Sequence, residues 1–348
     1  MTETAIRPEN PILATRSRNG FVERTHTGRI AIIDGRAGPE GALLFAAGDV
    51  ETPFLPRSSC KILQAMPLVE SGAADAARLT PQRLALACAS HQGSHRHAAL
   101  AEKWLAEMDL SAADLMCGPQ VPNDRETRAA LRLAGDEPSQ LHNNCSGKHT
   151  GFLCQARHLG AHTDGYIDND HAVQRAVADA TAELAGEVPA GFAIDGCSAP
   201  NYAVSPHGMA RAMARIAAAE TALDGSRRAA AIRLREAMAL NPFEVAGDGR
   251  CCTELMTVGR GRFVIKTGAE GSFTGIIPER GLGIMVKIDD GNTAAAESVM
   301  AGLLVALGEL NGDDPKVTKW LTPSEVNRRG IVCGSGAPAE IVTNVTLS

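Results

Sequence analysis

Ser58-Ser59-Cys60-Lys61 opens an apolar run from Ile62 to Val69, and together they predict a helix over 60–71. Ser58 and Lys61 are three positions apart, so a helix places both side chains on one face. A neutral lysine beside a serine hydroxyl can accept its proton and make the serine a nucleophile. Taken alone, the pattern is a weak signal and more often marks an N-cap serine followed by a solvated lysine.

A second element about 200 residues further on favours the interpretation of Ser58 as a nucleophile. Lys266-Thr267-Gly268 follows a predicted strand, so the lysine head can project from the end of a sheet into a cleft. A serine–x–x–lysine followed by lysine–threonine–glycine is typical of penicillin-recognising serine acyl-transfer enzymes. On its own, Lys266 also fits an exposed lysine at the end of a strand.

The order of the predicted elements indicates an α+β fold. A hairpin is predicted over 28–34 and 42–47, because a β-branched run and an apolar run flank Gly35-Arg-Ala-Gly-Pro-Glu-Gly41. Three strands, 262–267, 272–277 and 282–287, and a helix over 292–310 close the chain. We therefore expect a sheet built from both chain ends, a helical middle portion and a cleft between them. Further helices are predicted over 81–89, 94–108, 125–134, 147–158, 169–186, 207–220 and 224–239, and a short strand over 191–196.

The domain organisation expected from this order is simple. Residues 1–17 are predicted to be a flexible arm, and 18–348 a single domain. Within that domain, the helical portion runs roughly over 58–190, and the sheet portion over roughly 20–50 and 191–348.

Composition excludes several classes of function. The 348 residues are 44% hydrophobic but only 3% aromatic, and the net charge is −6. An acidic chain with few aromatic residues lacks the basic and stacking surface that nucleic-acid binding needs. No run approaches 18 apolar residues, and residues 1–17 lack the apolar core of an export signal, so we expect a cytoplasmic protein without a membrane partner.

Polar turns carry further candidate residues. Ser90 lies in Cys88-Ala-Ser-His-Gln-Gly-Ser94, and Cys145 and Lys148 lie in a dense polar run over 141–151. Cys197 follows Asp195-Gly196, and Cys251-Cys252 comes later. Thiolates at separated turns can form half of a zinc site, although their spacing is not that of a zinc finger. Arg57 and the lysines make this set locally basic, which suits a small substrate that carries a carboxylate.

Together these motifs resemble the rhizobial-type family of inducible, thermolabile L-asparaginases. The resemblance extends from about 20 to 330. It is carried by Pro56-Arg-Ser-Ser-Cys-Lys61, Ala89-Ser-His-Gln-Gly-Ser94, His142-Asn-Asn-Cys-Ser-Gly-Lys-His149, His171-x-x-Gln174, Asp195-Gly-Cys-Ser-Ala-Pro200, Cys252-Thr-x-Leu-Met256 and Lys266-x-Gly-Ala-Glu-Gly271. It implies a fold similar to serine β-lactamases and glutaminases, and a homodimer.

The resemblance also implies roles for individual residues. Ser58 with Lys61, and Ser90 with Lys266, would form two neighbouring serine–lysine tandems. Zinc would be held by three side chains and a water molecule, and five residues would bind substrate. The implied zinc ligands are Cys145, Lys148 and Cys197, and the implied substrate-binding residues are Arg57, Asn144, His149, Asp195 and Cys252. Relatives carry Asp where Cys252 stands, which leaves the role of Cys252 open.

The expected activity is hydrolysis of L-asparagine to L-aspartate and ammonia through an acyl-enzyme, with zinc orienting the substrate. Ser58 has the stronger local argument as nucleophile, because Lys61 is one helical turn away, but Ser90 stays possible. Two alternatives remain: a β-lactamase- or peptidase-like serine acyl hydrolase, and a non-catalytic zinc or redox sensor. The absence of an export signal and of a clear serine–aspartate–asparagine element opposes the first. The second leaves both serine–lysine pairs without a purpose.

Overall fold

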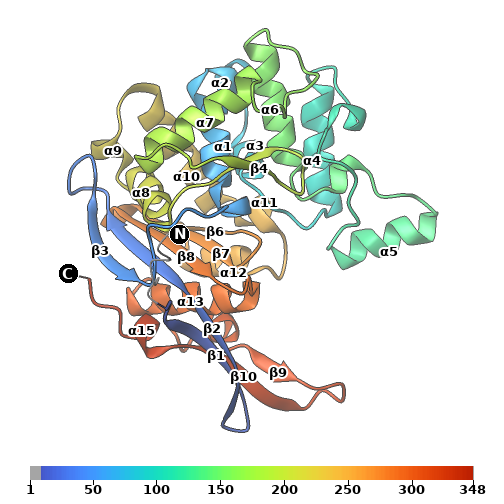
Figure 1. The fold of residues 1–348 in the computed structure, drawn as a ribbon. Helices are drawn as coiled ribbons and strands as arrows, with labels where there is room; N and C mark the ends of the chain where they lie inside the picture. The colour runs from blue at the N-terminus through green and yellow to red at the C-terminus, as the bar shows by residue number, and fades with distance from the viewer. Residues whose placement is uncertain (1–8, 348) are drawn as a thin grey trace, which may run out of the picture.

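One antiparallel sheet forms the base of the molecule, and a helical part covers it (Figure 1). The computed structural model describes residues 9–347. Strand order is β6-β7-β8-β2-β1-β10-β9, with β3 paired to β2. The strands are β1 (Ile12–Arg18), β2 (Phe21–Asp34), β3 (Ala42–Ala47), β6 (Val264–Thr267), β7 (Ser272–Ile277), β8 (Leu282–Ile288), β9 (Ser324–Val326) and β10 (Val332–Pro338). The N-terminal strands β2 and β1 lie between β8 and β10 of the C-terminal part, which confirms the expected sheet built from both chain ends and the α+β class.

The N-terminal arm is shorter than predicted. Residues 12–18 form β1, which pairs with β2 on one side and β10 on the other. This pairing satisfies the backbone of β1 and buries Leu13 and Ala14, at 0% and 1% exposure, in the core. The remainder of the predicted arm over 1–8 lies outside the described residues. The predicted hairpin over 28–34 and 42–47 is confirmed by the pairing of β2 with β3.

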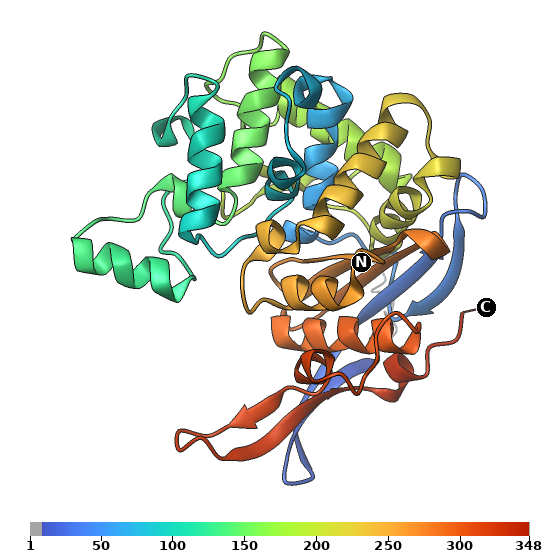
Figure 2. The same cartoon turned by 180° about the vertical axis from the view of Figure 1, so that it is seen from behind.

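The predicted helices are confirmed within a few residues at either end, and six further helices of the described residues, α2, α9, α11, α12, α14 and α15, were not predicted. Seen from behind, the helices of the middle portion of the chain lie above the sheet, and the C-terminal helices lie below it (Figure 2). The bounds of all these helices are α1 (Lys61–Glu70), α2 (Ala73–Ala76), α3 (Pro81–Ala87), α4 (His95–Ala106), α5 (Arg125–Ala134), α6 (Ser146–His158), α7 (Ala172–Ala185), α8 (Pro206–Ala217), α9 (Ala219–Ala222), α10 (Gly225–Leu240), α11 (Pro242–Ala246), α12 (Cys251–Gly259), α13 (Thr293–Ala306), α14 (Pro315–Leu321) and α15 (Glu340–Thr343). A separate two-stranded ribbon joins β4 (Phe192–Ile194) to β5 (Pro200–Tyr202).

The helical part continues past residue 190, contrary to the boundary we predicted. Helix α10 packs against α1, and α8 packs against α7 on one side and against β2, β7 and β8 on the other. Nine of the twelve residues of α8 are buried, because both of its faces meet protein. The alanine-rich composition of 206–240 allows this close packing between layers.

A glycine in β8 sets the distance between α8 and the sheet. A Cβ atom on Gly283 would lie 2.0 Å from the backbone nitrogen of Ala214 in α8. On the opposite face of the sheet, a Cβ atom on Gly275 would meet Met300 of α13 at 3.5 Å. The sheet is therefore covered on both faces, and only glycine permits the approach of α8.

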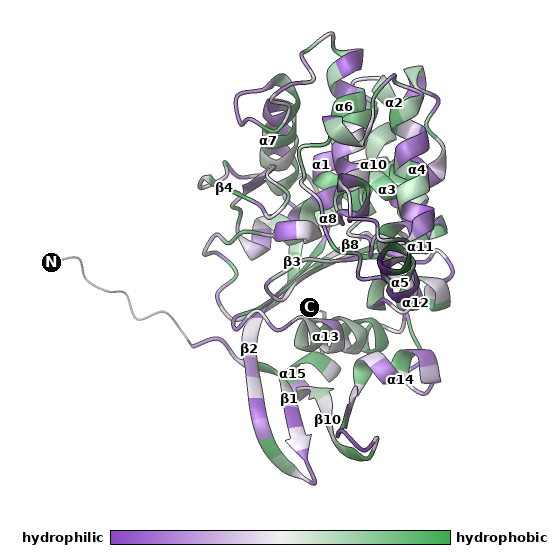
Figure 3. Ribbon diagram, turned by 90° about the vertical axis from the view of Figure 1, so that its right-hand side faces the viewer, coloured by the Kyte–Doolittle hydropathy of each residue, from purple (hydrophilic) through white to green (hydrophobic). Residues whose placement is uncertain are grey.

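Helix α13 is mostly apolar and is green over much of its length in Figure 3, whereas polar residues mark the outer part of β2. This agrees with its position against β7, β8 and β10. Among the helices in the described part of the chain, none has both the length and the apolar character needed to cross a membrane.

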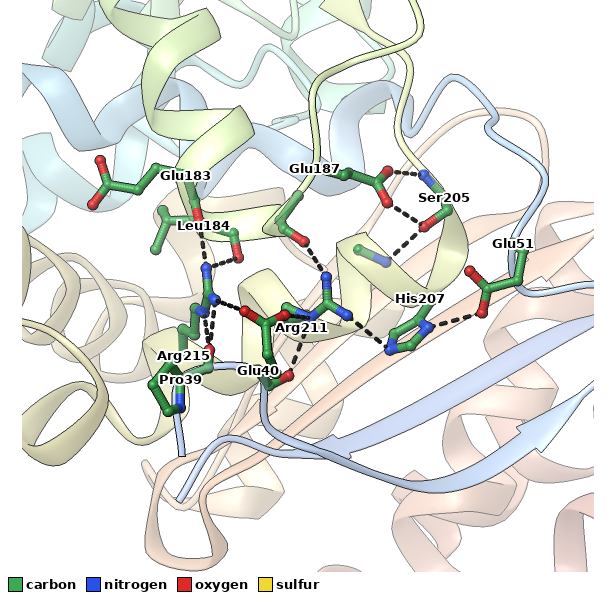
Figure 4. A network of polar contacts seen from close by, with 12 residues as sticks. Pro39, Glu40, Glu51, Glu183, Leu184, Glu187, Ser205, His207, Arg211 and Arg215 are labelled. Atoms are coloured by element: carbon green, nitrogen blue, oxygen red, sulfur yellow. Dashed lines mark hydrogen bonds and ion pairs between the residues drawn. The ribbon is translucent and has the colours of Figure 1, made fainter. Parts of the chain in front are cut away.

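Two arginines of α8 attach the loop of the β2–β3 hairpin to the helical part (Figure 4). Arg211 donates to the carbonyl of Glu40 at 3.1 Å and to that of Ala185 at 2.9 Å. Arg215 donates to the carbonyl of Pro39 at 2.9 Å and also reaches the end of α7. Guanidinium groups have enough donors to link three segments at once, so this hairpin loop and α7 are held to one helix.

Candidate active site

Ser58 lies in a single 3₁₀ turn, Arg57–Cys60, that leads directly into α1. Arg57 adopts a left-handed backbone conformation, with φ +52°, which is unusual for a residue with a side chain. The amide of Asn201 holds it there: Oδ1 accepts from the backbone N–H of Arg57 at 3.0 Å, and Nδ2 donates to its carbonyl at 3.3 Å. A strained residue held in this way fixes the direction in which the next side chain, Ser58, points.

Ser90 and Lys266 form a direct hydrogen bond. Lys266, in β6, donates from Nζ to Ser90 Oγ at 2.9 Å, and both residues are buried. Burial lowers the pKa of Lys266 to about 7, and the positive charge of Lys61 acts in the same direction. An amine with such a pKa is partly neutral near pH 7 and can act as a base.

Lys61 is fully buried at the start of α1. Its Nζ donates to the carbonyl of Ala89 and, at 3.4 Å, to that of Asn144. The structure therefore brings Lys61 to the wall that carries Ser90 and Asn144, while its amine makes no hydrogen bond to Ser58. Catalytic hydrogen bonds are often formed only when substrate is bound.

Ser58 and Ser90 both line a pocket of about 190 Å³ between the helical part and the sheet, whereas Lys61 and Lys266 lie behind its wall. The pocket lies where the cleft was predicted. Its walls are polar and are contributed by Ser58, Ser90, His91, Asn123, Asn144, Arg250, Thr267, Gly268, Ala269 and Thr293.

Two backbone N–H groups of the pocket are free to bind an anion. Ser58 and Ala269 both line the pocket, and within residues 9–347 neither of their N–H groups donates a hydrogen bond. Free N–H donors beside a nucleophile are suited to stabilise the oxyanion of an acyl-transfer reaction.

The predicted substrate-binding residues divide into two groups. Asn144 lines the pocket. Arg57 and Asp195 instead pair with each other, with an Nη2–Oδ1 distance of 2.7 Å. His149 is fully buried and shares a 2.7 Å hydrogen bond with the hydroxyl of Tyr166, and Cys252 lies behind Thr267, whose N–H donates to its Sγ at 3.3 Å. Neither His149 nor Cys252 lines the pocket.

The three predicted zinc ligands are brought together. Cys145, Lys148 and Cys197 are each at most 3% exposed, and Lys148 Nζ lies 3.1 Å from Cys197 Sγ. Hydrogen bonding with Cys145, together with the charge of Lys148, lowers the pKa of Cys197 despite its burial, and the same hydrogen bond and burial raise the pKa of Cys145. One thiolate, one thiol and the ammonium group of Lys148 thus share a small buried space.

This donor set fits zinc in its chemistry, because sulfur and nitrogen are the ligands that zinc prefers. The Nε2 atom of His149 has no hydrogen-bond partner, although it is buried beside this set. No group of three or more His, Cys, Asp or Glu side chains in the described residues is arranged to hold a metal ion. The predicted set contains only two residues of those types.

Several pocket residues were missed by the sequence analysis. Arg250, Asn123, Thr293 and His91 were not selected, and Thr267 was noted only as part of the lysine–threonine–glycine motif. Arg250 directly precedes the Cys251-Cys252 pair, and His91 directly follows Ser90. Their position next to a selected motif is the sequence feature that could have identified Arg250 and His91 as candidates.

The topology defines the class: an α+β protein with a polar pocket between its helical part and its sheet. A family model described as L-asparaginase II matches residues 14–338. The chain therefore belongs to the L-asparaginase II family, as its motifs suggested. Among curated proteins, none matches the chain.

Solved structures give distant likenesses of architecture. A crystal structure of Mglu in its native form is 14% identical with a TM-score of 0.46, and the match covers 88% of this chain and 70% of that one. A beta-lactamase from Mycobacterium bovis is 15% identical with a TM-score of 0.40, covering 77% of this chain and 89% of that one. A mutant of a class C beta-lactamase is 13% identical with a TM-score of 0.37, with coverage of 77% and 89%.

Proposed function

We propose that this protein hydrolyses L-asparagine to L-aspartate and ammonia. Membership of the L-asparaginase II family supports an amidohydrolase. The observation that carries the proposal is one pocket lined by two serines, with a lysine hydrogen-bonded to one of them and free backbone N–H groups beside the other.

In the proposed reaction, Ser58 Oγ attacks the carbon of the side-chain amide. Lys61 takes the proton of Ser58, and the N–H groups of Ser58 and Ala269 receive the developing negative charge on the amide oxygen. The carbon–nitrogen bond then breaks, and ammonia leaves with a proton passed through Ser90 from Lys266. Water then adds to the acyl-enzyme and gives its proton to Lys266. The bond between Ser58 Oγ and the acyl carbon breaks, Ser58 recovers its proton from Lys61, and L-aspartate is released.

The free N–H of Ser58 favours this serine over Ser90 as the nucleophile. The Ser90–Lys266 hydrogen bond favours a proton-transfer role for the second pair, because Lys266 has a pKa of about 7 and can both accept and donate a proton.

Zinc is a second element of the proposal. Cys145, Lys148 and Cys197 would hold it, and a bound zinc ion supplies a positive charge that polarises and orients oxygen ligands. Asp195 is hydrogen-bonded to Arg57, which directly precedes Ser58. The Arg57–Asp195 pair therefore links the turn that contains Cys197 to the turn that contains Ser58. We further propose that the protein acts as a cytoplasmic homodimer.

Ammonia release from L-asparagine by the purified protein tests the proposal, with L-glutamine and the Ser58→Ala variant as controls. Release from L-asparagine that is weak with glutamine and absent in the variant is the expected result. If no ammonia is released with or without added zinc, the proposed function is wrong. Nitrocefin turnover would then favour the β-lactamase alternative.

A further inference from the structure

Arg250 lines the pocket, but the reaction proposed above gives it no role. It lies between α11 and α12 and contributes to the pocket wall. Within the described residues, its guanidinium makes neither a hydrogen bond nor an ion pair. By contrast, the guanidinium of Arg57 is already bound to Asp195.

Within the described residues, no acidic side chain forms an ion pair with Arg250. Lys266 is cationic or neutral, and Cys252 is a buried thiol whose pKa burial raises. Glu297 of α13 interacts with Arg250 through its charge, but it lies beyond the 4.0 Å limit of an ion pair. Burial raises the pKa of Glu297 to about 7, so this carboxyl is only partly ionised at neutral pH.

A second polar group in the same wall is also without a partner. Thr267 is 6% exposed and lines the pocket, yet its hydroxyl makes no hydrogen bond. Buried polar groups are usually satisfied, and an exception at a pocket indicates a group that a ligand satisfies. A hydroxyl donor and an unpaired guanidinium together match the needs of a carboxylate.

We infer that Arg250 and Thr267 bind the α-carboxylate of the substrate and thereby select amides of amino acids over simple amides. This inference rests on the proposed function, since it assigns a subsite for the same substrate. The pocket then has two ends, with Ser58 and Ala269 at the amide and Arg250 and Thr267 at the carboxylate. A ligand that bridges them has a fixed length, which is how the site would discriminate L-asparagine from L-glutamine.

The test compares two substrates that differ only at this group: L-asparagine, and L-asparagine amide, in which a carboxamide replaces the α-carboxylate. We expect Arg250→Gln to lower kcat/KM for L-asparagine by about 10- to 150-fold, mostly through KM, because it removes a charge-assisted hydrogen bond. For L-asparagine amide the same variant should change kcat/KM less than threefold. Thr267→Val should show the same selectivity with a smaller loss, and Arg250→Lys should restore part of the affinity.

Arg260→Gln is the matched control, because Arg260 lies exposed at the other end of α12 and does not line the pocket. It should leave both substrates unaffected. Equal losses for the two substrates in Arg250→Gln would show that Arg250 supports the fold or the chemistry, and would overturn the inference while the proposed function stands.

Calorimetric titration with L-aspartate separates this inference from the proposed function. If the wild-type protein releases no ammonia, the function fails, but the inference still predicts that L-aspartate binds and that Arg250→Gln weakens its Kd at least tenfold. A Kd unchanged within twofold, or no binding to the wild-type protein, would overturn the inference.

Discussion

Lys266 Nζ lies 2.9 Å from Ser90 Oγ, although 176 residues separate them in the chain. Ser90 follows α3 in the helical part, whereas Lys266 is in β6 of the sheet. The hydrogen bond therefore crosses the junction between the two parts of the molecule, next to Ser58. In the proposed reaction, this hydrogen-bonded pair transfers the proton to the leaving ammonia, and the predictions below follow from that role.

The pH dependence of the reaction should follow Lys266. Because burial and Lys61 lower the pKa of Lys266 to about 7, the amine loses its proton above this pH and can no longer donate it through Ser90 to the leaving ammonia. We expect kcat/KM for L-asparagine to fall as the pH rises through about 7. Lys266→Ala should reduce the rate by about 10²- to 10⁴-fold, the usual contribution of general acid–base catalysis, and remove this limb of the profile. A limb that persists in the variant would assign the titration to another group.

Substitution of Ser58 and substitution of Ser90 should impair different steps of the reaction. Ser58→Ala removes the attacking oxygen, so turnover should fall by at least about 10³-fold and no acyl-enzyme should form. Ser90→Ala disturbs proton transfer, so turnover should fall by about 10²-fold or more while a covalent intermediate stays detectable. Mass spectrometry of acid-quenched reactions distinguishes the two variants. Accumulation of acyl-enzyme in Ser58→Ala, and none in Ser90→Ala, would reverse the assignment.

Loss of the proposed zinc ligands should affect binding of substrate more than its conversion. Cys145→Ala should raise KM more than it lowers kcat, because a metal that orients substrate contributes mainly to binding. Chelation of the wild-type protein should have the same effect, and metal content measured by mass spectrometry should fall in the variant. Cys333→Ala is the control, since Cys333 lies in β10, in the sheet rather than at the pocket. Complete loss of kcat at saturating substrate, with the fold intact, would contradict this role.

Gly283→Ala should destabilise the protein. The added Cβ would lie 2.0 Å from the backbone of α8, which has no flexible atoms to move away. Overpacking of this kind costs about 1–3 kcal/mol or more, so the midpoint of thermal unfolding should fall by several degrees. Gly196→Ala is the control, because a Cβ there meets nothing within 4 Å. Equal midpoints in calorimetry would mean that α8 can shift away from the sheet at little cost.

Much of the fold was predictable because its signals are local. The apolar periodicity of 60–71 and 147–158 predicts α1 and α6 within a few residues, and the glycine-rich turn at 35–41 predicts the β2–β3 hairpin. β1 was missed because a seven-residue segment with three arginine or serine side chains in its second half has no strong pattern of its own. Its strand conformation comes from pairing with β2 and β10, which are distant in sequence.

By itself, the sequence determined which residues are candidates for the chemistry: Ser58 with Lys61, the lysine–threonine–glycine at 266–268, and the cysteines at 145 and 197. These depend on residue type and on separations of a few residues, which local backbone geometry converts directly into shared faces and turns. Only the tertiary structure decided which of them touch. The tertiary structure places Lys266 in hydrogen-bonding distance of Ser90 and directs Lys61 to the carbonyls of Ala89 and Asn144. It also pairs Arg57 with Asp195, and it leaves Arg250 without a partner among the described residues. The physical reason is that such contacts depend on how the helical part packs against the sheet, and that packing is the sum of many long-range contacts that no short stretch of sequence contains.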